Sequence, residues 1–352
     1  MDNSFLNKKV FFISAILTFP PDEGLRAVIY NLYKEIRQKT DLLAVTSVNN
    51  KNLSAEVVSI ALNKFFINRQ LKALVSNFKP DIIFYASEAS CSFNSFIRGV
   101  VLRRMGKGAK VVILGSQHRE FMVWQRLLLK FIKPDLLFLL GGADVLFFQE
   151  HGLTVKVLPP AIDSHKFHPV SKSEKDILRK KYNISSDKIV ISHVGHINRK
   201  RNIDHFIPIQ KMSNVQVLIV GSTTTAVDSE LKSKLLAAGI MIIDTYVEAI
   251  EEIYQLSDLY VFPVKRNDAA IEMPLSVLEA MACNLPIVTT RFGGLVDYFK
   301  EDEGFRYCDD MNGLLPLIEK MVGAVISNDK KVMQFSWGNF TNNILVSLDE
   351  LS

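Results

Sequence analysis

Short apolar runs alternate with amphipathic helical patterns along the whole chain of 352 residues. The runs are rich in Val, Ile and Phe, which is typical of strands that are buried on both faces. This alternation predicts βαβ units around parallel sheets, and therefore an α/β fold. In the first half the expected strands cover residues 10–15, 42–47, 81–85, 110–114, 136–140 and 155–158.

The strand pattern starts again after a polar stretch over residues 170–188, so we expect two doubly wound domains. The second set of expected strands covers residues 188–194, 215–220, 241–244, 259–264 and 286–290. Open α/β sheets bind ligands at the carboxyl ends of their strands. Two such sheets in tandem would place the active site in a cleft between the domains.

The composition excludes several classes of protein. With 48% hydrophobic and 22% charged residues the chain can bury a core, unlike a disordered polymer. No apolar run reaches the ~18 residues of a spanning helix, and the first residues lack the long apolar core of a signal peptide. We therefore expect a cytoplasmic protein. Three cysteines far apart in sequence, Cys91, Cys283 and Cys308, indicate packing roles and neither disulfides nor a metal site.

The positive charge is concentrated in the first half of the chain. Residues 1–170 hold 22 basic and 13 acidic residues, and the rest hold 20 and 24. The basic residues are interleaved with apolar ones and no nucleic-acid module is evident, so we expect no nucleic-acid partner. Helices expected over residues 93–105 and 121–133 could contact an anionic membrane surface peripherally, at the inner face of the membrane. Alternatively, these helices cover the sheet and their cations form an ordinary solvated face.

The most informative stretch covers residues 269–299. It predicts a loop, a helix that opens near Pro274, a strand from residue 286 and a turn at Gly293 and Gly294. Backbone N–H groups at the start of such a helix favour a phosphate. Glu279 lies about one turn further, where a carboxylate can accept hydrogen bonds from ribose hydroxyls. The alternative is that Glu279 pairs locally and that the two glycines are only structural.

The segment PLSVLEAMACNLPIVTTRFGG, within 269–299, resembles the E-x7-E region of the group 1 glycosyl transferases, a retaining, glycosyltransferase family 4-like group of GT-B fold. The stretches 158–169, 192–207 and 246–264 resemble the same family in the same order. The resemblance implies two Rossmann-like domains that face an interdomain cleft. It implies an acceptor-binding domain over 1–165, a nucleotide-sugar donor domain over 166–335, and a C-terminal helix over 336–352 that can pack back on the first domain.

The resemblance also implies a donor site. Glu279 matches the family carboxylate that binds the nucleotide ribose, and Arg201 matches the lysine that contacts the diphosphate. A cation there would stabilise the charge of the leaving nucleoside diphosphate. The remaining expected donor-site residues are Gly195, His196, Pro274, Leu275 and Ser276.

Two positions depart from the family pattern. The other family glutamate falls on Ile271, and Glu272 is one residue late. Either the loop shifts so that Glu272 reaches the donor sugar, or the donor contact is a variant one; alternatively Glu272 is a solvated loop charge. His196 stands where the family has Arg, which leaves open whether Arg199 or Lys200 supplies the second charge.

On the acceptor side the match is weaker. A single Gly24 replaces the usual glycine pair of the first loop. His118, just beyond an expected strand, resembles a family position from which an imidazole faces the donor sugar. A lone histidine is about as often a structural residue.

Together these residues predict a glycosyltransferase, with Arg201, Glu272 and His118 as candidate catalytic residues. It would move a sugar from a UDP- or GDP-type donor to a glycan or lipid-linked acceptor with retention of configuration. The sequence has no zinc spacing and no GxxxxGK[ST] loop, so we expect neither cofactor nor metal. A catalytically silent subunit that binds sugar nucleotide or a partner enzyme is the alternative. A sugar-nucleotide epimerase would need an acid/base set that the sequence lacks.

Overall fold

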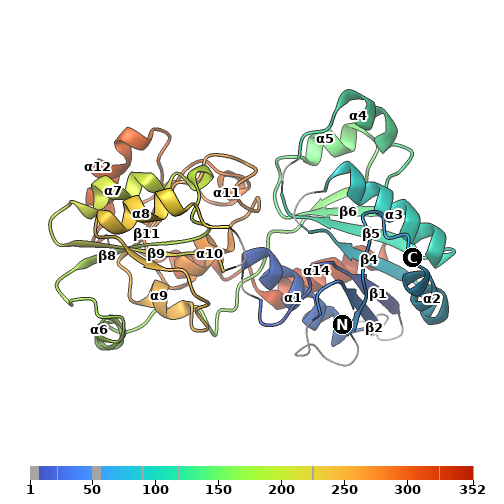
Figure 1. The fold of residues 1–352 in the computed structure, drawn as a ribbon, viewed down its shortest axis with the longest axis horizontal. Helices are drawn as coiled ribbons and strands as arrows, with labels where there is room; N and C mark the ends of the chain where they lie inside the picture. Colours follow the sequence, from blue (N-terminus) through green and yellow to red (C-terminus); the bar gives the residue numbers. More distant parts are fainter. Residues whose placement is uncertain are drawn as a thin grey trace. The chain divides into compact units, whose positions relative to one another are not determined.

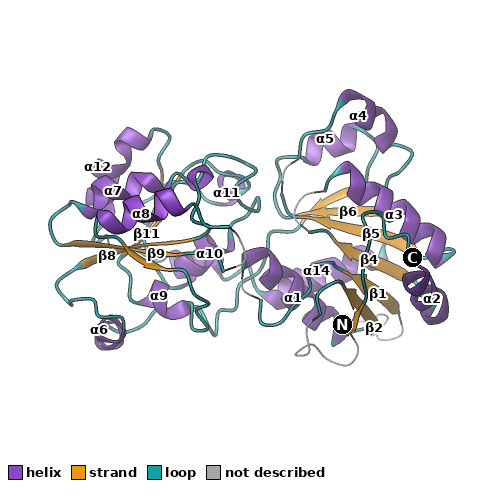
Figure 2. Cartoon of the chain, in the orientation of Figure 1, coloured by secondary structure: helices purple, strands orange, loops and turns teal. Residues whose placement is uncertain are grey.

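The structure is a computed structural model that describes residues 8–21, 23–49, 57–88, 91–117, 119–223, 226–324 and 326–351. The chain divides into two compact units (Figure 1). Unit 1 comprises Met1–Ala161, Ile271–Met273 and Trp337–Ser352, and unit 2 comprises Ile162–Ala270 and Pro274–Ser336. Each unit is a parallel sheet with helices, so the predicted α/β class is confirmed (Figure 2).

Unit 1 contains a seven-stranded parallel sheet in the order β3-β2-β1-β4-β5-β6-β7. Its strands are β1 (Lys9–Ile13), β2 (Asp41–Thr46), β3 (Val57–Ser59), β4 (Ile82–Ala86), β5 (Lys110–Gly115), β6 (Leu136–Leu139) and β7 (Val155–Val157). Its helices are α1 (Gly24–Arg37), α2 (Arg69–Phe78), α3 (Phe93–Gly106), α4 (Val123–Leu129), α5 (Val145–Glu150) and α14 (Trp337–Asp349).

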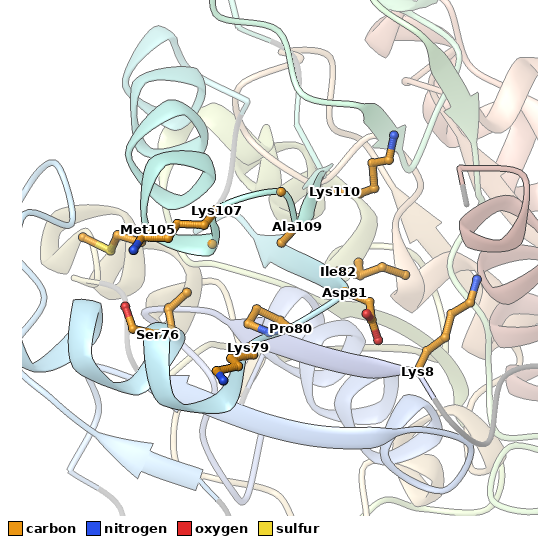
Figure 3. Close-up of a pocket in the computed structure, with 13 residues that line it drawn as sticks. Lys8, Ser76, Lys79, Pro80, Asp81, Ile82, Met105, Lys107, Ala109 and Lys110 are labelled. Atoms are coloured by element: carbon orange, nitrogen blue, oxygen red, sulfur yellow. The ribbon is translucent and has the colours of Figure 1, made fainter.

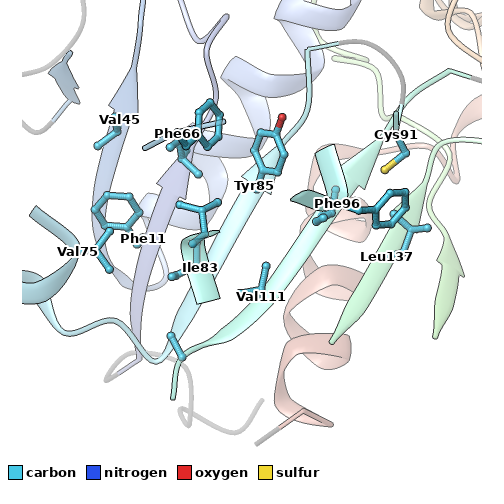
Figure 4. Close-up of a cluster of buried hydrophobic side chains, with 14 of the residues drawn as sticks. Phe11, Val45, Phe66, Val75, Ile83, Tyr85, Cys91, Phe96, Val111 and Leu137 are labelled. Atoms are coloured by element: carbon cyan, nitrogen blue, oxygen red, sulfur yellow. The ribbon is translucent and has the colours of Figure 1, made fainter. Parts of the chain in front are cut away.

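Both faces of the unit 1 sheet are buried. On one face Phe11 of β1 and Ile83 of β4 pack against Val75 of α2 and Phe96 of α3 (Figure 4). On the other face Phe12 stacks on Phe84 with ring centroids 5.6 Å apart. Burial on both faces explains why the strands are continuous apolar runs without alternation.

The C-terminal helix α14 belongs to unit 1. It contacts α1, and Asp349 near its end forms an ion pair with Lys8 at 3.0 Å. Lys156 of β7 donates to the hydroxyl of Ser347 at 3.1 Å. The chain therefore leaves unit 1 after Ala161 and, apart from the short segment Ile271–Met273, returns to it at Trp337.

Unit 2 contains a six-stranded parallel sheet in the order β10-β9-β8-β11-β12-β13. Its strands are β8 (Ile189–Val194), β9 (Val215–Val220), β10 (Met241–Ile243), β11 (Leu259–Phe262), β12 (Ile287–Thr289) and β13 (Phe305–Tyr307). Its helical segments are α6 (Lys172–Lys181), η2 (Arg199–Arg201), η3 (Ile203–His205), α7 (Phe206–Gln210), α8 (Ser229–Ala237), α9 (Glu251–Gln255), α10 (Leu275–Ala282), α11 (Leu295–Tyr298), η4 (Met311–Gly313), α12 (Leu314–Met321) and α13 (Asn328–Val332).

The strand order of unit 2 reverses between β8 and β11. Chain order proceeds outward from β8 through β9 to β10 on one side, and from β11 through β12 to β13 on the other. The connections at the carboxyl ends of β8 and β11 therefore diverge, which leaves the crevice where doubly wound sheets bind ligands. The site of unit 2 is expected at this point.

Cys91, Cys283 and Cys308 are buried and free. Within the described ranges, no helix has the length and apolar character that are needed to cross a bilayer.

Candidate functional site

The carboxyl end of β8 brings Gly195 and Arg201 together. A Cβ atom built on Gly195 would lie 2.9 Å from Nη1 of Arg201 and 3.0 Å from Nε2 of His193. A side chain at this position would have to displace the end of the Arg201 side chain, so glycine allows the guanidinium to approach the backbone. Arg201 ends η2, is 7% exposed, and its guanidinium lies over the ring of Phe262 at 6.0 Å. The buried guanidinium of Arg201 thus lies beside the backbone at Gly195.

The two neighbouring cations point elsewhere. Arg199 is exposed and forms ion pairs with Asp228 at 3.2 Å and Glu230 at 2.8 Å. Lys200 is exposed and pairs with Asp268 at 2.8 Å. Of the three basic residues in this loop, Arg201 is the one that lies against Gly195.

Helix α10 begins beside this loop in unit 2. Pro274 is the residue before the first helical one, and its backbone has φ −66° and ψ 116°. Among the residues that the structure describes, no side chain caps this end of the helix, so the N–H groups of Leu275 and Ser276 are available to a ligand. Ser276 makes a side-chain hydrogen bond with Tyr260 of β11, whose hydroxyl lies 3.3 Å from the Val194 carbonyl oxygen. Tyr260 therefore links the start of α10 to the end of β8.

Glu279 lies further along α10 and accepts a hydrogen bond from the hydroxyl of Tyr254 at 2.7 Å. Burial raises the pKa of Glu279 to about 7, although the Tyr254 hydrogen bond and the charge of Lys166 lower it. Glu251 adds to the increase by like-charge repulsion. Glu279 is thus a partly desolvated carboxylate that changes charge near neutral pH.

Glu272 is placed differently from the other predicted donor residues. It belongs to the short segment Ile271–Met273 that lies in unit 1. Its backbone N–H donates to the carbonyl oxygen of Ser116 after β5 at 2.9 Å, and its side chain is packed against Gly141 after β6. It is 3% exposed, so it is not a solvated loop charge. Its carboxylate lies at the carboxyl edge of the unit 1 sheet.

Several other predicted residues lie in loops or at helix ends. His196 follows Gly195 and is partly buried. Gly24 is exposed and begins α1. His118 lies outside the described residues. Gly293 has φ +50° and, with Gly294, forms the turn before α11, a backbone conformation that favours glycine.

Three residues that contact Arg201, Glu279 or the start of α10 in unit 2 were not expected from the sequence: His193, Tyr254 and Tyr260. All three are fully buried. In the sequence they lie within or beside apolar runs, where a polar residue resembles ordinary core. The available signal was the polar atom itself, because a buried imidazole or phenol needs a hydrogen-bond partner.

A cavity of about 800 Å³ lies elsewhere, at the amino ends of β4 and β5 in unit 1 (Figure 3). Its lining includes Lys8, Lys79, Lys107 and Lys110. Figure 3 shows the amino groups of Lys79 and Lys107 directed away from those of Lys8 and Lys110, so the four cations do not converge on one point. This edge is opposite to the carboxyl edge at which parallel sheets bind ligands.

No group of three or more His, Cys, Asp or Glu side chains with the geometry of a metal site occurs among the residues that the structure describes. Metal independence therefore stays a prediction. Arg201 and the start of α10 are groups that could bind an anion at this edge of the unit 2 sheet.

Comparison with known proteins identifies a family for the segment that carries this cluster. Residues 174–315 match the family model described as glycosyl transferases group 1. The D-inositol 3-phosphate glycosyltransferase of Geodermatophilus obscurus is 28% identical over 156 residues, which cover 40% of this chain and 33% of that protein. The sulfoquinovosyl transferase of Arabidopsis thaliana is 23% identical over 268 residues, which cover 70% of this chain and 48% of that protein. The chain thus spans less than half the length of these two curated relatives.

Solved structures extend the likeness of fold to nearly the whole chain. Sucrose-phosphate synthase from Thermosynechococcus elongatus superposes with a TM-score of 0.77 at 15% identity, over 98% of this chain and 99% of that one. HepE from Anabaena, solved in complex with UDP-glucose, superposes with a TM-score of 0.75 at 15% identity, over 97% and 100%. Residues 174–315 thus resemble the group 1 glycosyl transferases, and the likeness to these solved structures shows that the chain has the GT-B fold.

Proposed function

We propose that this protein is a glycosyltransferase that moves a sugar from a nucleotide-diphosphate sugar to a glycan or lipid-linked acceptor, with retention of configuration. The observation that carries the proposal is the cluster at the carboxyl edge of the unit 2 sheet. There Arg201 lies against Gly195, and α10 begins uncapped and carries Glu279. This set offers a cation and backbone N–H groups for a diphosphate, and a carboxylate for ribose hydroxyls.

The chemistry that such a cluster supports is stabilisation of the leaving group. The bond between the anomeric carbon and the phosphate oxygen breaks, and the nucleoside diphosphate gains negative charge. Arg201 and the start of α10 would stabilise that charge. The acceptor oxygen bonds to the anomeric carbon on the same face, and its proton passes to the leaving phosphate. In this scheme the protein positions both substrates and needs no nucleophile, cofactor or metal.

Unit 1 supports a proposal about the acceptor, because α4 exposes a large apolar face. Six residues in and beside α4 are 42–74% exposed, and Leu146 of the neighbouring α5 is 73% exposed. The six are Met122, Val123, Trp124, Leu127, Leu128 and Phe131. We name these seven residues the α4 patch. Exposed apolar areas of this kind mark interaction sites.

Charge favours an anionic membrane as the partner of the α4 patch. Over residues 119–133 the basic residues are Arg119, Arg126, Lys130 and Lys133, against the single acid Glu120. An apolar surface ringed by cations can lie in the interface of an anionic bilayer. We therefore propose peripheral contact with the cytoplasmic face of a membrane, and a lipid-linked acceptor presented there. Helix α3, by contrast, buries Phe96 and Leu102 on the sheet, as an ordinary covering helix does.

A panel of nucleotide sugars tests the proposed activity. The protein is incubated with UDP- and GDP-sugars, and free nucleotide and sugar are measured over time. A glycosyltransferase should release nucleotide slowly by hydrolysis of its preferred donor, and faster when the correct acceptor is added. Binding without release would indicate a silent subunit, and conversion of the sugar without loss of nucleotide would indicate an epimerase. The anomeric configuration of the product, measured by NMR, tests retention.

A further inference from the structure

His193 is a fully buried side chain at the switch point of the unit 2 sheet. The ladder between β8 and β11 ends at the pair Ser192 and Tyr260. One residue further, Nδ1 of His193 lies 2.9 Å from the carbonyl oxygen of Val261. The imidazole thus bridges the two strands at the point where they begin to separate.

The Val261 contact fixes how the ring is protonated. A carbonyl oxygen only accepts, so Nδ1 must carry the proton and donate it. Burial lowers the pKa of His193 to about 3, with the charges of Arg201 and His196 acting in the same direction against the Val261 hydrogen bond. The ring is therefore neutral, and Nε2 carries a lone pair. Within the described residues, this Nε2 atom has no hydrogen-bond partner.

Nε2 of His193 lies near the point at which Arg201 approaches the backbone of Gly195. The Cβ position of Gly195 is 3.0 Å from Nε2 of His193 and 2.9 Å from Nη1 of Arg201. Both side chains also lie on the ring of Phe262, with the guanidinium at 6.0 Å and the imidazole at 6.1 Å. A guanidinium only donates hydrogen bonds and a neutral imidazole nitrogen accepts them, so the two groups are complementary.

We propose that His193 is a positioning residue, whose Nε2 accepts a hydrogen bond from Arg201 when a nucleoside diphosphate binds and so aims the guanidinium at the diphosphate. The inference rests on the proposed function, because it needs a diphosphate at Gly195. It assigns a role to a residue that the family resemblance left without one. Buried acceptors that lack a partner are rare in native structures, which is why this atom calls for a role at the site.

Two conservative variants of His193 test the roles of its two ring nitrogens separately. In His193→Asn the side-chain amide can still donate to Val261, but no acceptor replaces Nε2. In His193→Gln the longer side chain can place its amide oxygen near Nε2. Calorimetry with UDP and GDP, and with uridine and guanosine, should show about tenfold weaker binding of the preferred diphosphate to His193→Asn and near wild-type binding to His193→Gln. Nucleoside affinity should be the same in all three proteins.

A double-mutant cycle and ¹⁵N-histidine labelling of the wild-type protein complete the test of His193. In an Arg201→Ala background, His193→Asn should cause no further loss of diphosphate affinity. In ¹⁵N-histidine spectra, the histidine that stays neutral down to pH 5 should shift at Nε2 when UDP or GDP is added, while Nδ1 stays unchanged. This measurement decides the question even where a variant does not fold.

The outcomes distinguish this inference from the proposed function. If the wild-type chain binds no nucleoside diphosphate, the proposed function fails and this inference fails with it. If it binds one and all three proteins bind it equally, only the inference fails. Equal losses for nucleoside and diphosphate, or an Nε2 signal that does not respond to the diphosphate, also overturn the inference, since they indicate a purely structural histidine.

Discussion

At the scale of single residues, we expect the charge of Glu279 to affect binding of the donor. Glu279→Gln removes a charge-assisted hydrogen bond to ribose, a loss of ~1.5–3 kcal/mol. We expect at least tenfold weaker binding of the preferred nucleotide by calorimetry at pH 8.5, where Glu279 is ionised. Glu230→Gln, which changes an exposed carboxylate of the same unit, serves as the control. Unchanged affinity in Glu279→Gln would remove the ribose assignment.

The raised pKa of Glu279 also predicts how stability depends on pH. Its ordinary value is 4.5 and its folded value is about 7, so between these values the folded state holds a proton that the unfolded state has lost. Stability therefore falls as pH rises through this window, by about 2–3 kcal/mol at most. Urea denaturation from pH 4.5 to 8.5 should show this fall in the wild type and a flatter profile in Glu279→Gln.

Glu174, an exposed carboxylate whose pKa is lowered, is the control for this dependence of stability on pH. Hydrogen bonds from Ser171 lower the pKa of Glu174, so its contribution is present above its ordinary value of 4.5 and is lost as pH falls below it. Glu174→Gln should change the acid limb and leave the window between pH 4.5 and 7 as in the wild type. A Glu279→Gln profile that keeps the wild-type slope would contradict the raised pKa.

Arg201 should matter for the diphosphate more than for the nucleoside. Arg201→Ala is expected to lower nucleotide release and diphosphate affinity by tenfold or more, with nucleoside affinity unchanged, because its partner is the charge that grows as the leaving group departs. Arg199→Ala is the matched control, since Arg199 pairs with Asp228 and Glu230 at the surface. Thermal melts and an Arg201→Lys variant exclude a folding defect. Equal losses for nucleoside and diphosphate would remove Arg201 from this role.

At the scale of elements, the apolar runs predicted most strands of both sheets. The expected strand over 188–194 is β8 and the one over 215–220 is β9, within one residue. Strands β3 and β13 were missed, although β7, β10 and β12, which also have three residues each, were predicted. The helix expected over 121–133 is shorter, since α4 covers only Val123–Leu129. The pattern thus predicts the central strands of both sheets and, of the edge strands, β7 and β10.

The candidate site was less predictable than the sheets, because it depends on contacts between segments far apart in sequence. The motif placed Gly195, Arg201 and Glu279 in one unit, and the structure agrees. It could not show that Glu272 packs on the unit 1 sheet, because that contact joins residues more than a hundred positions apart. His193 was missed for the same reason: its role depends on Val261 and Arg201.

A buried cation, Arg179, joins helix α6 of unit 2 to the segment that follows α9, beside the Lys175–Asp258 ion pair at 3.2 Å. Arg179 of α6 is 5% exposed, donates to the Leu256 carbonyl at 3.0 Å and forms an ion pair with Asp258 at 2.5 Å. Arg179→Ala leaves Asp258 without this partner, so we expect a loss of about 3 kcal/mol in urea denaturation. Lys181→Ala, which breaks an exposed pair with Glu252, should cost at most about 1 kcal/mol. If both variants lose at most about 1 kcal/mol of unfolding free energy, Arg179 does not stabilise the packing of α6.

At the scale of the whole molecule, the charge asymmetry and the α4 patch make the same prediction about location. Residues 1–170 carry nine more basic than acidic residues, and the patch gives this charge an apolar centre. We expect the protein to co-sediment with anionic liposomes at low salt, less with neutral liposomes, and less again at high salt, because salt screens the attraction to headgroups.

Variants in the α4 patch test whether its exposed apolar side chains bind the membrane. Replacing Trp124 and Leu127 by Ser removes two apolar side chains that are 52% and 66% exposed, so binding to anionic liposomes should fall at least tenfold while the thermal transition stays unchanged. Ile177→Ser is the matched control, because Ile177 is 67% exposed on α6 of unit 2 and should not affect sedimentation. If pelleting is independent of salt, of anionic lipid and of the patch, the acceptor need not be membrane-bound and α4 serves another partner.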